Sequence, residues 1–216
     1  MDTAFQKHVN AAPYNLSFTA ASLRPELARI VVEHFLAVRD WEKTKEHILS
    51  TNALQCRSAS SAERLELELR KRLETLSDEQ LTLLAQATAE DRVAMAWLAA
   101  CKRISFAFEF VAETLRDKLA ARDNILRPSD YETYVETKAI AHPELMKLSA
   151  STKIKIRQVL LKMLSEAGLL GAGIELGTIQ RPVLSPAARH AITSDDPRWL
   201  AGFLVPDQEI GGLGHS

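Results

Sequence analysis

Compact signatures of an active site are missing from this sequence. It contains neither the G-x-x-x-x-G-K-[S/T] loop that binds nucleotide phosphates nor the G-x-G-x-x-G turn that binds dinucleotides. Gly171 and Gly173 are spaced as in the second motif, but its third glycine is absent. His142 and Glu144 match the H-x-E of zinc deaminases, yet no P-C-x-x-C exists to complete the metal ligands. We therefore expect a protein that is not an enzyme and that holds no metal or other cofactor.

Cysteines and long apolar runs are also scarce. Two cysteines, Cys56 and Cys101, cannot form a disulfide framework or a metal-ligand set, so we expect reduced thiols. The N-terminus has no basic region followed by an apolar core, so no signal peptide is expected. The longest apolar run, residues 93–101, falls well short of the roughly 20 residues of a membrane helix. These features predict a soluble, cytoplasmic protein without membrane contact.

What is present is an ordinary globular composition with an uneven distribution of charge. The chain has 216 residues, 46% hydrophobic and 25% charged, with a formal net charge of −1. This length corresponds to one or two domains. The segment 143–168 nevertheless contains five lysine or arginine residues against two glutamates. A locally basic surface can bind phosphates even when the whole protein is nearly neutral.

Hydrophobic residues recur with helical period along most of the chain, which predicts a mainly α fold. We expect Ser22 to cap a first helix that extends to about residue 38, and a later helix to cover residues 62–76. The region 89–122 is apolar on several sides, which is typical of a buried central helix, with a break near residues 102–105. The predicted organisation is an extended N-terminal arm (1–21), a helical bundle (22–124), a winged-helix-like module (125–205) and a disordered tail (206–216).

The module depends on the stretch 149–184. A helix with a basic outer face is predicted after Ser149, Ser151 or Thr152, each of which is a possible N-cap. Gly168 would end this helix, and residues 174–176 and 179–184 would form a short β-hairpin around a turn at Gly177. Two short helices, a tight turn and a third helix followed by a hairpin are the pattern of a winged helix-turn-helix.

Two groups of residues are candidates for nucleic-acid contacts. The first is the outer face of the predicted third helix; the second combines a helix N-terminus with hydroxyls and guanidinium groups that suit phosphates. The simpler interpretations are a solvated polar face and a serine-rich helix cap. The first group is Lys153, Lys155, Arg157, Gln158 and Lys162, and the second is Arg57, Ser58, Ser60, Ser61 and Arg64.

Two blocks resemble the BrxA family of BREX phage-defence systems. They are LSFTAASLRPELARIVVEHF at residues 16–35 and LSASTKIKIRQVLLKMLSEAGLL at residues 148–170. The regions 97–110 and 127–131 also match the family pattern, so the resemblance covers roughly residues 14–205. It implies a small, all-helical cytosolic protein encoded beside a methyltransferase, an ATPase and other defence proteins. It also implies binding to double-stranded DNA and a fold partly similar to the NusB antitermination factors, with no catalytic motif to carry over.

The expected function is therefore duplex-DNA binding within a multi-protein phage-defence system. Two alternatives remain open at this point. One is an adaptor whose helical faces bind other defence proteins without nucleic acid, and the other is an RNA binder.

Overall fold

The most apolar region of the sequence becomes the centre of the fold. In the computed structural model, which describes residues 12–212, this region forms four consecutive helical segments. They are α5 (Ala89–Arg103), α6 (Ser105–Glu109), a π-helical turn η2 (Phe110–Leu115) and α7 (Arg116–Ala120). The backbone of Ile104 leaves helical geometry, with φ −121° and ψ 81°, which confirms the break predicted near residues 102–105.

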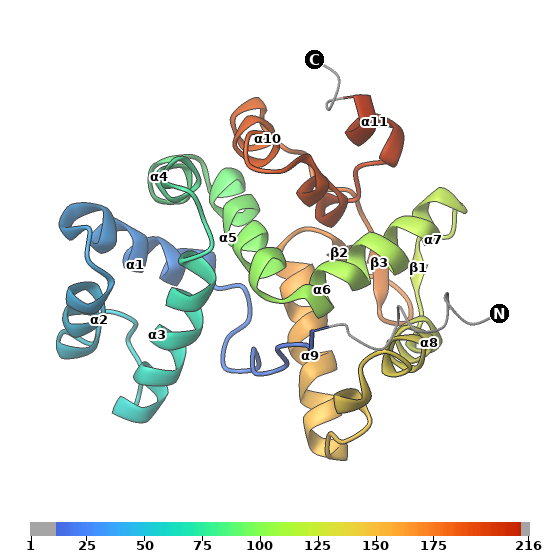
Figure 1. Ribbon diagram of the computed structural model, residues 1–216, viewed down its shortest axis with the longest axis horizontal. Coiled ribbons are helices and arrows are strands. Elements are labelled where there is room, and N and C mark those ends of the chain that lie inside the picture. The colour runs from blue at the N-terminus through green and yellow to red at the C-terminus, as the bar shows by residue number, and fades with distance from the viewer. Residues whose placement is uncertain (1–11, 213–216) are drawn as a thin grey trace.

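Four helices from the N-terminal half lie on one side of α5 (Figure 1); α1, α3 and α4 contact α5, and α2 packs on α1 and α3. Polar side chains cap the N-terminal ends of three of them. Asp40 accepts hydrogen bonds from two first-turn amides, and Ser77 and Gln80 form a reciprocal capping box. The four are α1 (Pro25–Val38), α2 (Trp41–Ser50), α3 (Ala59–Leu73) and α4 (Asp78–Gln86).

The next part of the chain forms a small three-stranded sheet, and two α-helices lie between the first and second strands in the sequence. The strand order is β1-β3-β2 with both pairings antiparallel, and Thr178 pairs with Ile125 on one side and Gly171 on the other. Since helices make up most of the described residues, the predicted mainly α class is confirmed. The elements are β1 (Ile125–Leu126), α8 (Pro128–Ala139), the 3₁₀ turn η3 (Pro143–Leu145), α9 (Ala150–Glu166), β2 (Leu170–Gly171) and β3 (Gly177–Ile179).

The last segments return to the bundle. They are α10 (Pro186–Thr193), the 3₁₀ helix η4 (Pro197–Phe203) and α11 (Asp207–Gly211). The segment α10 contacts α4 and α5, and η4 contacts α5 and η2. The division at residue 124 stays a prediction, although these contacts join residues on both sides of it.

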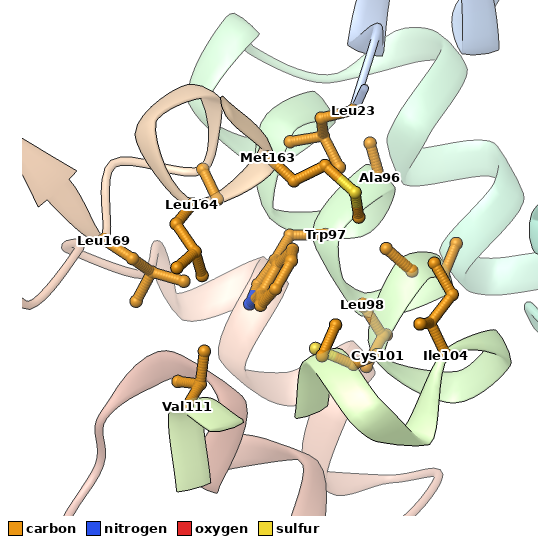
Figure 2. Close-up of a cluster of buried hydrophobic side chains, with 14 of the residues drawn as sticks. Leu23, Ala96, Trp97, Leu98, Cys101, Ile104, Val111, Met163, Leu164 and Leu169 are labelled. Carbon is orange, nitrogen blue, oxygen red and sulfur yellow. The ribbon is translucent and has the colours of Figure 1, made fainter. Parts of the chain in front are cut away.

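A tryptophan lies where these parts meet. Trp97 of α5 is fully buried, and its indole N–H donates to the carbonyl of Gly202 at 2.8 Å. Figure 2 shows Met163 and Leu164 of α9 beside the ring, and Leu23, which precedes α1, near Met163. The two halves of the chain therefore share one hydrophobic core.

An extended strap of residues 12–24 is tied to both halves. The buried guanidinium of Arg72 in α3 donates to the carbonyls of Phe18, Ala21 and Ser22, and its Nε donates to Glu68 at 2.8 Å. The Tyr14 hydroxyl donates to Glu109 at 2.5 Å, and its ring stacks on His142. Residues 12–21 form no helix or strand, and residues 1–11 lie outside the described part of the chain, so the arm of residues 1–21 stays a prediction.

Several predicted boundaries are wrong. Helix α1 starts at Pro25 and not after Ser22, because the Ser22 hydroxyl donates to Glu166 instead of capping a helix. Helix α3 starts at Ala59, three residues earlier than expected, because Ser58 is the cap. It ends at Leu73 and not at residue 76.

The hairpin and the tail also differ from expectation. The hairpin exists, but its strands are 170–171 and 177–179, and Gly177 lies in a strand and not in the turn. A side chain at Gly177 would lie 2.6 Å from the Gly171 carbonyl, so close strand approach explains this glycine. In the predicted disordered tail, residues 207–211 form α11, while residues 213–216 lie outside the described residues.

We expect Arg72→Met to destabilise the protein by about 3–5 kcal/mol, because it leaves Glu68 and three strap carbonyls without their buried partner. Urea unfolding followed by circular dichroism measures the change. Lys71→Met is the matched control on the same helix, since Lys71 is partly exposed and its pair with Glu74 is worth at most about 1 kcal/mol. Equal losses in the two variants would contradict the anchoring role of Arg72.

Candidate nucleic-acid interface

Helix α9 forms as its sequence predicts. Of the three possible N-caps, Ser149 is the one used, and its Oγ accepts from the Thr152 amide at 3.2 Å. The predicted inner face is buried, and Gly168 leaves the helix with φ +71°. That face consists of Ile156, Leu160, Met163, Leu164 and Ala167.

The opposite face presents cations to solvent. Lys155, Gln158 and Lys162 lie on this face, and all three are exposed. Lys153, which is exposed, and Arg157, which is half-buried, lie on the side of α9 that borders α8. Among residues 12–212, no carboxylate forms an ion pair with Lys153, Lys155 or Arg157. These three charges therefore remain available to an external anion.

Lys162 differs from the other cations of this face. It lies 3.7 Å from Glu166, one turn further along α9, although its side chain is 60% exposed. Glu166 also accepts hydrogen bonds from the Ser22 hydroxyl at 3.0 Å and the Leu23 amide at 2.6 Å. An exposed pair of this length contributes little, so Lys162 can exchange Glu166 for a phosphate at small cost. Its spacing of four residues from Glu166 is a signal that the sequence contains.

Arg157 and Lys153 lie at the edge of a groove between α8 and α9. The groove has a volume of about 340 Å³, and its apolar lining includes Phe106, Met146 and Ile154. Tyr131 forms part of the same lining. Burial raises the pKa of Tyr131 to about 12, and the nearby positive charge of Arg157 opposes that rise. The α9 face thus combines a basic stripe with an apolar edge.

The second predicted group begins α3. The Ser58 hydroxyl accepts from the Ser61 amide at 3.3 Å and lies 2.9 Å from the Ser61 hydroxyl, so both serines are engaged in the cap. Ser60 is in the first turn and not in a preceding loop, with its hydroxyl 3.4 Å from that of Ser58. Arg57 and Arg64 are exposed and form no ion pair within the described part of the chain.

The structure relates these two groups in space. The N-terminal ends of α3 and α9 point toward the same edge of the molecule, the lower edge in Figure 1, with the strap between the two helices. A further cation, Lys147, is exposed just before Ser149 and was not among the expected contact residues. Its position two residues before a helix cap was the available signal.

Residues 12–212 show neither the side-chain cluster of a metal site nor a helix suited to cross a membrane. No group of three or more histidine, cysteine, aspartate or glutamate side chains is placed to hold a metal ion there. In the same range, no helix combines the length and apolar character required to cross a bilayer.

The fold and this face define a mainly helical protein that carries a basic helix beside a small antiparallel sheet. The model of the BrxA family matches residues 12–196, and the chain belongs to that family.

Two curated proteins and one solved structure are similar to it. The chain is 28% identical over 141 residues to BREX protein BrxA of Escherichia coli O9:H4 (strain HS), covering 65% of this chain and 66% of that protein. It is 24% identical over 143 residues to BREX protein BrxA of Bacillus cereus (strain H3081.97), covering 66% and 72%. The chain thus matches just under two thirds of the E. coli protein.

The crystal structure of an uncharacterized protein from Magnetospirillum magneticum superposes with a TM-score of 0.74 at 18% identity, covering 89% of this chain and 98% of that one. This likeness shows that the fold is shared.

We expect Ser149→Ala to destabilise the protein by about 1 kcal/mol, because the first turn of α9 loses its capping oxygen. Hydrogen exchange should also accelerate at the Thr152 and Lys153 amides. Ser151→Ala is the matched control, since Ser151 lies inside the turn and does not cap it. Faster exchange in the control than in Ser149→Ala would show that Ser149 is not the residue that caps α9.

Proposed function

We propose that this chain is a non-catalytic double-stranded DNA-binding component of a BREX phage-defence system. The observation that carries the proposal is the exposed stripe of cations on α9, which is formed mostly of groups without a carboxylate partner in residues 12–212. The defence context comes from the family and from the names of the two BREX relatives.

The order of elements supports this assignment. A strand, two helices and a hairpin follow one another as β1, α8, α9, β2 and β3, and β1 completes the sheet by pairing with β3. We interpret this connectivity, with α6 to α7 as a preceding helix, as that of a winged helix-turn-helix. In such modules the helix before the hairpin enters the major groove, and here that helix is α9.

The dimensions of α9 fit this role. A major groove about 12 Å wide admits one α-helix. Lys155, Gln158 and Lys162 follow one another along the outer face, where Lys155 and Lys162 suit phosphates and Gln158 suits a base edge or a phosphate. Lys153 and Arg157 extend the positive charge toward the groove beside α8.

The start of α3 supplies a second contact in this proposal. Arg57 and Arg64 are exposed, one just before α3 and one in its second turn. The N-terminal ends of α3 and α9 point toward the same edge of the molecule (Figure 1). The hydroxyls of Ser58, Ser60 and Ser61 surround the same helix end. Because these hydroxyls already bond to one another, the arginines carry most of the attraction for a phosphate.

Lys155→Glu combined with Lys162→Glu should abolish duplex binding at moderate salt. If the wild-type protein contacts four phosphates, log K falls with log salt at a slope of about −3.6, and losing two contacts reduces the slope to about −1.8. Fluorescence anisotropy with a labelled duplex measures both quantities.

The matched control carries Lys43→Glu and Lys71→Glu, which reverse the same number of charges. These side chains lie near the end of α3 that is remote from Arg57, where Arg70 approaches Glu42. The control variant should bind with nearly wild-type affinity. Unchanged binding in the α9 variant would exclude the α9 face as the DNA contact. Tighter binding of a matched RNA duplex would show that RNA, and not DNA, is the ligand.

A protein-binding role is the second candidate, and the groove beside α9 is the observation that favours it. Met146 and Ile154 are exposed at this groove, and apolar side chains at a surface groove suit a partner helix. Capture of another defence protein that persists at high salt, without duplex binding at low salt, would favour this role over DNA binding.

A further inference from the structure

Three arginines from separate elements meet two carboxylates of one short helix. Arg116 at the start of α7 pairs with Asp207 of α11. Arg181, two residues after β3, and Arg189 of α10 lie 3.6 and 3.7 Å from the two carboxylate oxygens of Glu209. The set Arg116, Arg181 and Arg189 is called the arginine triad below.

The arginine triad has no other ion-pair partner in the described chain. Within residues 12–212, the ion pairs of all three guanidinium groups are made with α11 alone. The Arg116 side chain is only 16% exposed, so its guanidinium is held in a defined position by its surroundings. Planar guanidinium groups are well suited to bind phosphate oxygens.

By contrast, α11 is weakly attached. It has five residues and none of them is buried, while Asp207 is 85% exposed. A helix this short is not stable by itself in water. Beyond the three ion pairs, the partly buried Ile210 is its apolar contact with the core. The carboxylates of Asp207 and Glu209 are exposed, and ion pairs with an exposed partner contribute little, so α11 can be displaced by a stronger anion.

The arginine triad and its two carboxylate partners differ in whether the BrxA family match covers them. The match to the BrxA family covers residues 12–196, which includes all three arginines of the triad. The carboxylates of Asp207 and Glu209 lie beyond the matched range.

We propose that the arginine triad is a second surface for the phosphates of duplex DNA, and that α11 covers it in the free protein by placing carboxylates where phosphates would bind. In Figure 1, α11 lies at the end of the molecule opposite to the N-terminal end of α9, so this surface is separate from the α9 face. The identity of the ligand rests on the proposed function, whereas the arginine triad and its cover do not.

The test removes the two negative charges without changing side-chain size. The variant Asp207→Asn with Glu209→Gln should bind a labelled duplex about 10-fold more tightly. Its salt slope should steepen by about 0.9 for each phosphate gained, and by about 2.7 if all three arginines engage. Glu79→Gln with Glu90→Gln is the matched control, because both are exposed and form no ion pair within residues 12–212. The control changes net charge equally and should gain little.

A second background separates this surface from the α9 face. In a protein carrying Lys155→Glu and Lys162→Glu, the α11 variant should restore part of the duplex binding. Arg181→Glu with Arg189→Glu, added to the α11 variant in either background, should remove the gain. A thermal unfolding midpoint close to that of the wild type, measured by circular dichroism, confirms that each variant is folded.

The outcomes are distinguishable. A gain no greater than that of the control overturns the arginine triad as a DNA surface, whatever the α9 variants do. A gain that survives Arg181→Glu with Arg189→Glu also overturns it, because the binding must then come from elsewhere. If the α9 variant binds duplex as the wild type does while the α11 variant gains affinity, the proposed α9 face fails and the triad stands.

Discussion

The burial of residues 94–101 of α5, around Trp97, is the constraint on which the rest of the structure depends. A helix that is apolar on most sides must be covered on most sides, and neither half of the chain can do this alone. The N-terminal helices cover one side of α5, and α9, α10 and η4 cover its other sides. The hydrogen bond from the Trp97 indole to Gly202 adds a polar restraint inside the same contact.

This constraint determines how α9 is presented. Its C-terminal half is fixed by Met163 and Leu164 against the core and by the hydrogen bonds that Glu166 accepts from the strap. Its N-terminal half carries Lys153 and Lys155 into solvent. Cations placed on a rigid element lose less entropy when they bind an anion than cations on a loop, which suits a surface for a long polyanion.

Local patterns predicted a large part of this structure. The cap of α9 at Ser149 and the buried face of that helix follow from interactions within one or two helical turns, so the sequence contains the necessary information. Predictions were wrong where a distant residue competes for the same atoms. Ser22 was assigned as a cap, but its hydroxyl is used by Glu166, which is 144 positions away. The strand positions depend on how closely Gly177 and Gly171 approach, which local propensity does not describe.

The sequence by itself determined the helical class, the identity of the central buried segment and the outward direction of Lys155 and Lys162, because each depends on periodicity along a single element. Only the tertiary structure decided that α3 and α9 direct their N-terminal ends to one edge, that Lys162 shares Glu166 with the strap, and that α11 meets three arginines. Those relations join residues that are far apart in the chain, and they arise only when the shared core fixes where each helix lies.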